Sequence, residues 1–126
     1  MKILIAENDP AISDVLLDYL RSVKDLDKIR TETTVVTSTD EAYDQLEHAD
    51  LLIIDIDGIK AIVAQKALCH QLIPVIVISS RFMPYDRIPE YRMPLRLIEK
   101  SRLSLSNFRM AMRDFEDISS TVALAE

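Results

Sequence analysis

The chain has 126 residues, of which 48% are hydrophobic and 29% are charged, and its formal net charge is −6 at pH 7. This composition is typical of one globular domain and excludes a disordered or fibrous chain. The negative charge argues against binding of nucleic acid, because phosphates are attracted by clustered lysine and arginine. Gly58 is the only glycine, which excludes the glycine-rich loops that bind the phosphates of ATP and NAD.

The sequence also predicts where the protein is found. No apolar run approaches the roughly 18 residues that a membrane span requires, and no basic stretch leads into an apolar signal sequence. Cys69 has no second cysteine to pair with, which fits a reducing compartment. We therefore expect a cytoplasmic protein that does not contact a membrane.

The N-terminal part predicts a strand followed by a helix. Residues 2–6 form a short apolar run, and Asp9 followed by Pro10 is a typical helix start, with the aspartate as N-cap. The following apolar residues recur at helical spacing and form one face, which fits a helix lying on a sheet: Ile12, Val15, Leu16, Tyr19, Leu20 and Val23.

A second pair of elements and a central strand come next. The β-branched residues at 33–37 favour a strand, and Ser38 with Glu41 forms a capping box for a second helix. Residues 51–54 form a continuous apolar run that ends at Asp55. Such a run is typical of a central parallel strand that is covered on both faces.

The next segment predicts a third helix and a fourth strand. We expect Gly58 to break the chain after the third strand, and helical spacing then relates Ile59, Ile62, Val63, Ala67 and Leu68. Residues 74–78 predict a fourth strand that closes at Ser79. Residues 81–93 contain or adjoin prolines that favour extended or turn backbone, so a loop or a broken helix is expected there: Pro84, Pro89 and Pro94.

The C-terminal part completes an α/β domain. Residues 95–98 predict a fifth strand, and the apolar face of a last helix follows: Leu105, Phe108, Met112, Phe115 and Ile118. Alternating strands and helices specify a doubly wound sheet of parallel strands with right-handed crossovers. We expect one domain over residues 1–118, with residues 119–126 as a tail or the start of a linker.

Polar residues follow the predicted strands where each ends: Glu7, Asn8, Asp9, Asp55, Ser79 and Lys100. In doubly wound folds the carboxyl ends of the strands form the ligand site, so these side chains should converge. Gathered carboxylates require a bound cation or an ammonium group, and Mg²⁺ and Lys100 would serve. Asp55 can then attack phosphorus while Ser79 and Lys100 bind the developing negative charge, which is phosphoryl transfer.

Four segments carry a resemblance to a known family: ILIAENDP, DLLIIDIDG, PVIVISS and EK. In order and spacing they resemble the receiver domain of two-component response regulators, over nearly the whole chain. The resemblance implies a flavodoxin-like five-stranded sheet, with the fourth helix here shortened or irregular. It also implies that Asp55 is phosphorylated by a histidine kinase or phosphotransfer protein, with Ser79 as the switch hydroxyl and Lys100 in contact with the phosphoryl group.

The resemblance further implies a Mg²⁺ site and a set of partners. The metal-binding residues would be Glu7, Asn8, Asp55 and Asp57. The domain would regulate an output domain or a protein partner and would not turn over a substrate as an enzyme does. No direct contact with nucleic acid is expected. A homodimer is compatible with the resemblance.

Several residues depart from the receiver pattern. Asn8 stands where receivers place a carboxylate ligand, so weak Mg²⁺ binding is expected. The segment between Asp55 and Gly58 is shorter than the usual loop, and Asp57 would partly replace the missing carboxylate. Ser101 replaces a cis proline and Leu97 an aromatic side chain, and both changes weaken the usual output mechanism.

Three alternatives remain open from the sequence. The first is a pseudo-receiver that takes no phosphate and acts through protein contacts. The second is a phosphatase of the haloacid dehalogenase type, with Asp55 as nucleophile and Asp57 as general acid. The third concerns Asp55 alone, because an aspartate at the end of a strand can simply cap the next helix.

Overall fold

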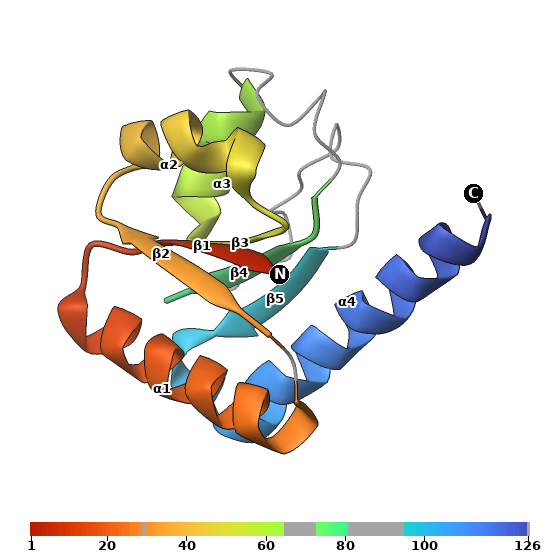
Figure 1. The fold of residues 1–126 in the computed structure, drawn as a ribbon. Helices are drawn as coiled ribbons and strands as arrows, with labels where there is room; N and C mark the ends of the chain where they lie inside the picture. Colours follow the sequence, from red (N-terminus) through yellow and green to blue (C-terminus); the bar gives the residue numbers. More distant parts are fainter. Residues whose placement is uncertain (29, 65–72, 81–94, 126) are drawn as a thin grey trace.

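The structure is a computed structural model that describes residues 1–28, 30–64, 73–80 and 95–125. Within this part of the chain, five parallel strands form one sheet in the order β2-β1-β3-β4-β5 (Figure 1). The elements are β1 (Lys2–Ala6), α1 (Pro10–Asp27), β2 (Glu32–Val36), α2 (Thr39–Gln45), η1 (Leu46–His48), β3 (Leu51–Ile54), α3 (Ile56–Ala64), β4 (Val75–Ser79), β5 (Leu95–Glu99), η3 (Lys100–Arg102) and α4 (Leu105–Ala125). The predicted doubly wound α/β fold is confirmed, whereas the predicted irregular segment at 81–93 lies outside the described residues.

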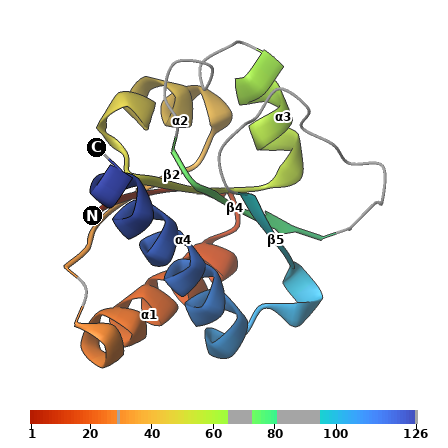
Figure 2. The same cartoon turned by 90° about the vertical axis from the view of Figure 1, so that its right-hand side faces the viewer.

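Helices cover both faces of the sheet. Helices α1 and α4 lie on one face and α2 and α3 on the other (Figures 1 and 2). Successive strand residues point to opposite faces, so Ile53 of β3 packs with the α1 and α4 side and Ile54 with the α2 and α3 side. Every residue of β3 and β4 is buried, which is why these strands have uninterrupted apolar sequences.

The predicted helix starts at Asp9 and Ser38 are confirmed. The side chain of Asp9 accepts a hydrogen bond from the Ala11 amide at 3.0 Å, and the Ser38 hydroxyl accepts one from the Glu41 amide at 3.2 Å. Each cap satisfies an amide that has no partner inside its own helix. Both helices therefore begin where local sequence chemistry places them.

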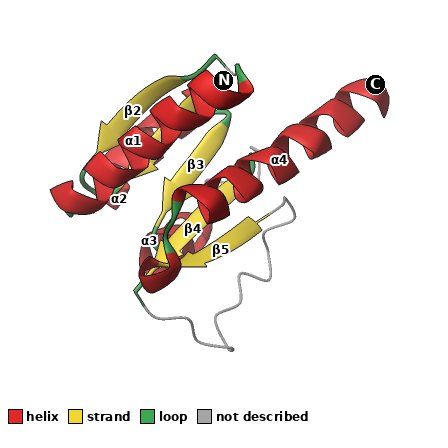
Figure 3. Cartoon of the chain, turned by 90° about the horizontal axis from the view of Figure 1, so that it is seen from below, coloured by secondary structure: helices red, strands yellow, loops and turns green. Residues whose placement is uncertain are grey.

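Helix α4 packs on α1 and continues past the sheet. Phe108 is fully buried, with its ring centroid 5.9 Å from that of Tyr19 in α1. The C-terminal part of α4 extends beyond the strands (Figure 3), and the helix runs to Ala125. Most of the segment expected as a tail is thus helical and continuous with α4, and the domain boundary at residue 118 stays a prediction. No helix in the described ranges is long and apolar enough to cross a membrane.

The structure corrects the role expected for Gly58. We expected this glycine to break the chain after the third strand, but it lies in the first turn of α3, which begins two residues earlier at Ile56. Only Asp55 separates β3 from α3. The expected helix residues Ala67 and Leu68 lie outside the described residues.

Candidate functional site

A cavity of about 240 Å³ opens at the carboxyl ends of β1, β2 and β3. Its lining residues come from the loops after these strands: Ala6, Glu7, Asn8, Thr37, Ser38, Thr39, Ile54 and Asp55. The structure therefore brings together Glu7 and Asn8, which follow the first strand, and Asp55, which follows the third. The site lies at the edge where doubly wound sheets bind their ligands.

Glu7 is a buried carboxylate with partners on both oxygens. Its side chain is 6% exposed, Oε1 accepts a hydrogen bond from the Asp9 amide at 3.1 Å, and Oε2 lies 3.9 Å from Nζ of Lys100. A charged group can be buried only when hydrogen bonds or an opposite charge compensate for lost water. Lys100, at the start of η3, thus reaches the opening acid across the sheet, as the sequence predicted.

Asp55 caps α3. The residue is exposed, its Oδ1 accepts a hydrogen bond from the Gly58 amide at 2.8 Å, and its backbone oxygen accepts one from the Ile59 amide at 3.0 Å. This is the N-cap arrangement, which the sequence left open as an alternative. The cap uses one carboxylate oxygen, and the other has no hydrogen bond to any residue in the described part of the chain. Capping and chemistry at Asp55 are therefore compatible.

Gly58 allows its neighbours an unusually close approach. A Cβ atom at this position would lie 2.6 Å from Oδ1 of Asp55 and 2.8 Å from two side-chain atoms of Ile54. Its φ angle is not positive, so any residue could adopt the backbone conformation. Glycine inside a helix costs roughly 0.5–1 kcal/mol relative to alanine. The close approach of Asp55 and Ile54 explains why glycine occupies position 58. Our sequence analysis missed this role of Gly58.

Ser79 and Asp57 do not line the cavity. Ser79 is 6% exposed at the end of β4, beside Glu99 of β5 in the sheet register. Asp57 is exposed in the first turn of α3. The hydroxyls on the cavity belong to Thr37, Ser38 and Thr39. The sequence analysis used Ser38 only as a helix cap, although the position of this trio after a parallel strand was a signal for the site.

The donor atoms on the cavity fit a weakly bound, largely hydrated Mg²⁺. Two carboxylates and one amide line it, those of Glu7, Asp55 and Asn8. Nowhere in the described residues do three or more histidine, cysteine, aspartate or glutamate side chains gather as a metal-binding group. Mg²⁺ commonly keeps several waters and takes one or two carboxylates from the protein. These three residues would hold the ion, whereas Asp57 is not placed on the cavity.

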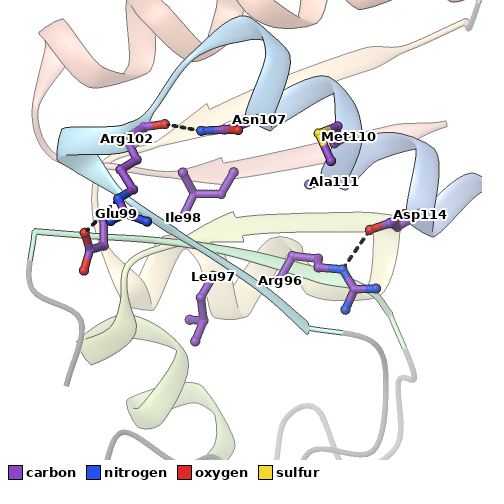
Figure 4. A pocket seen from close by; sticks show the side chains of 9 residues that line it. All are labelled: Arg96, Leu97, Ile98, Glu99, Arg102, Asn107, Met110, Ala111 and Asp114. Carbon is purple, nitrogen blue, oxygen red and sulfur yellow. Dashed lines mark hydrogen bonds and ion pairs between the residues drawn. The ribbon is translucent and has the colours of Figure 1, made fainter. Parts of the chain in front are cut away.

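A second hollow, of about 410 Å³, lies between β5 and α4 (Figure 4). Arg96 reaches across it to Asp114, with 3.0 Å between Nε and Oδ2. Leu97 points to the opposite side of β5 from Ile98, and Met110 is 62% exposed on α4. Arg96 is paired with Asp114 and Arg102 with Glu99, so the hollow offers no free carboxylate comparable to that of Asp55.

Comparisons with known proteins identify the fold. No protein-family model matches the chain, and no curated protein matches its sequence. Among solved structures, the N-terminal domain of a response regulator/sensory box/GGDEF three-domain protein from Carboxydothermus hydrogenoformans superposes with a TM-score of 0.72 and 14% identity, over 98% of this chain and 99% of that one. A signal receiver domain of a two-component histidine kinase from Clostridium thermocellum gives a TM-score of 0.61 and 12% identity, over 90% and 95% of the two chains.

A different kind of protein contains a similar unit. A lysine decarboxylase from Francisella novicida superposes with a TM-score of 0.64 and 12% identity, over 92% of this chain but only 17% of that one. Structural similarity at such low sequence identity identifies the fold only, and the function must be argued from the site. Full-length superposition on receiver domains, together with the strand order, shows that the chain has the fold of response regulator receiver domains.

Proposed function

We propose that the chain is a receiver-type signalling domain in which Asp55 accepts a phosphoryl group from a histidine kinase or phosphotransfer protein and thereby regulates a partner or an attached output domain in the cytoplasm. The observation that carries the proposal is the cavity shared by Asp55, Glu7 and Asn8, with Lys100 beside Glu7. A nucleophilic carboxylate, further metal-binding oxygens and a cation at one sheet edge are the groups that phosphoryl transfer requires.

Each residue has a distinct part in the proposed reaction. The Asp55 carboxylate attacks phosphorus, and the bond from phosphorus to the donor breaks, with its electron pair leaving on the donor. Lys100, whose side chain is 30% exposed, binds the added negative charge. A bound Mg²⁺ would neutralise part of the charge on the phosphoryl oxygens. Ser79 ends β4, the strand next to β3, and its hydroxyl is the proposed partner of a phosphoryl oxygen.

Mass spectrometry after treatment with acetyl phosphate and Mg²⁺ tests the proposal. We expect one labile phosphate adduct on the wild type and none on Asp55→Asn, which retains an oxygen for the helix cap. Asp44→Asn changes an exposed aspartate of α2 outside the cavity and serves as the control, which should still be modified. A wild-type protein without an adduct, or an adduct that persists in Asp55→Asn, contradicts the assignment.

The pseudo-receiver is the second candidate, and specific contacts favour it. One oxygen of Asp55 caps α3, both oxygens of Glu7 have partners, and Asn8 supplies an amide instead of a charge. These contacts compensate the carboxylates of the cavity from within the protein, as a receiver that takes no phosphate requires. A pseudo-receiver takes no adduct in the experiment above and binds its protein partner equally well before and after the treatment.

The phosphatase alternative has less support from the geometry. It requires Asp57 as a general acid next to Asp55, but Asp57 is exposed and does not line the cavity. A phosphatase would release phosphate repeatedly from small phosphate esters, whereas the proposed receiver takes up one phosphoryl group per cycle. Measuring phosphate release over many equivalents of ester separates the two.

A further inference from the structure

We propose that Gly58 is a positioning residue for the phosphoryl transfer: its backbone N–H holds Oδ1 of Asp55, so that Oδ2 is the oxygen that attacks phosphorus. This inference rests on the proposed function. It adds a residue and an atomic assignment that the receiver resemblance did not supply.

The Asp55 carboxylate is held through one of its two oxygens. The Gly58 amide donates to Oδ1 at 2.8 Å, and this is the only hydrogen bond to the Asp55 side chain from the described residues. This hydrogen bond fixes the carboxylate through Oδ1. Because Asp55 lines the cavity with Glu7 and Asn8, the remaining oxygen, Oδ2, is the one left for reaction. A nucleophile held in one orientation reacts faster because less freedom is lost on reaching the transition state.

Only glycine fits at position 58 without a shift of its neighbours. The chain contains one glycine in 126 residues, and it lies three residues after the proposed nucleophile. A Cβ atom there would lie 2.6 Å from Oδ1, whereas ordinary van der Waals contact begins at 3.4 Å. The same Cβ would lie 2.8 Å from two side-chain atoms of the buried Ile54, so both side chains would have to shift to make room. Alanine at this position would thus displace the Asp55 carboxylate and crowd Ile54 without removing any polar group.

The hydrogen bond from Gly58 can persist through the proposed reaction. With acetyl phosphate as donor, an electron pair of Oδ2 forms the new bond to phosphorus, and the bond from phosphorus to the acetate oxygen breaks. Acetate leaves with that electron pair, and Asp55 becomes a mixed anhydride. Oδ1 is then a carbonyl oxygen, which still accepts the hydrogen bond from Gly58. A donor already in place costs no reorganisation during the step.

The test compares phosphorylation rates of Gly58→Ala and the wild type over a range of acetyl phosphate concentrations in the presence of Mg²⁺. We expect the maximal rate to fall by roughly ten- to a hundredfold, the loss that a displacement of about 1 Å can cause. The half-saturating concentration should stay unchanged, because acetyl phosphate binding does not involve this amide. Ala61→Ser also adds one heavy atom to α3, on an exposed position, and should react like the wild type.

Amide hydrogen exchange gives a readout that does not depend on Gly58→Ala being folded. The Gly58 amide should be protected in the wild type and in Asp55→Asn, and should exchange about tenfold faster in Asp55→Ala, which lacks the acceptor. An unchanged exchange rate in Asp55→Ala overturns the inference, as does a Gly58→Ala protein that reacts at the wild-type rate. A wild type that takes no phosphate overturns the proposed function, and the positioning role with it.

Discussion

Arg109 of α4 binds Asp27 at the end of α1 through two hydrogen bonds, from Nε to Oδ2 at 3.0 Å and from Nη2 to Oδ1 at 2.6 Å. Arg113, one turn further along α4, lies 3.4 Å from the same Oδ1. The paired geometry of arginine on a carboxylate gives both strength and direction. The contact joins two helices that are distant in sequence and fixes how α4 lies on the domain.

This contact predicts a dependence of stability on pH. The hydrogen bond from Arg109, with the attraction of both arginines, holds the pKa of Asp27 below its ordinary value of 3.8. A carboxylate with a lowered pKa in the folded state stabilises the protein above its unfolded pKa, and this contribution is lost as the pH falls through the folded value. Asp27→Asn should therefore unfold at a lower temperature than the wild type at neutral pH, and the difference should shrink in acid.

Thermal unfolding followed from neutral pH to about pH 2 measures this effect. Asp25→Asn, a change at an exposed position in the same part of α1, is the matched control and should leave the unfolding temperature nearly unchanged. A difference between wild type and Asp27→Asn that is the same at every pH would contradict the interpretation.

Lys28 predicts a stabilising substitution. It ends α1 with φ 56° and ψ 36°, a left-handed conformation that glycine adopts without strain. Lys28→Gly should raise the free energy of unfolding by roughly 0.5–1 kcal/mol in denaturant titrations. Lys24→Gly should lower it by about 1 kcal/mol, because that lysine lies inside the helix. Effects of the same sign at both positions would refute the explanation.

The cap on α3 predicts a difference between two substitutions of Asp55. Asp55→Ala removes the acceptor for the Gly58 amide and should lower the free energy of unfolding by about 1 kcal/mol. Asp55→Asn keeps an oxygen acceptor and should be nearly as stable as the wild type. Urea titrations of the three proteins provide the measurement, and equal stability of the alanine and asparagine variants would rule out the cap.

Asn8 predicts how metal affinity can be raised. Asn8→Asp adds a third carboxylate to the cavity lining and should increase Mg²⁺ affinity roughly tenfold, because charge on the ligands attracts a hard dication. Isothermal titration calorimetry provides the comparison. Gln45→Glu adds the same charge at an exposed position outside the cavity and should have little effect. Equal affinities in Asn8→Asp and the wild type would argue against a site that includes this residue.

The helices and strands that the sequence predicted are those determined by residues close to one another in the chain. The aliphatic runs of β3 and β4 require burial on both faces, and the caps at Asp9 and Ser38 are set by residues within one helical turn. Such signals are independent of the rest of the fold, which is why the buried central strands and the helix starts followed from them.

The parts of the site that the sequence analysis missed depend on distances between side chains. A glycine after a strand usually indicates a turn, and the spacing of three between Asp55 and Gly58 was the available signal for a cap. Whether Ser79 and Asp57 face the cavity depends on how each strand end is directed, which apolar patterning does not encode. Convergence of Glu7, Asn8, Asp55 and Lys100 was predictable, because the carboxyl ends of parallel strands meet at one edge.

The strand order also affects how the protein resists aggregation. The two outer strands carry polar or charged residues, such as Glu32 on β2 and Arg96 on β5, and strands of this kind discourage pairing with another molecule. The uncharged aliphatic segments LLII and VIVIS lie in the interior of the sheet. The folded sheet therefore keeps these two segments from pairing with another molecule.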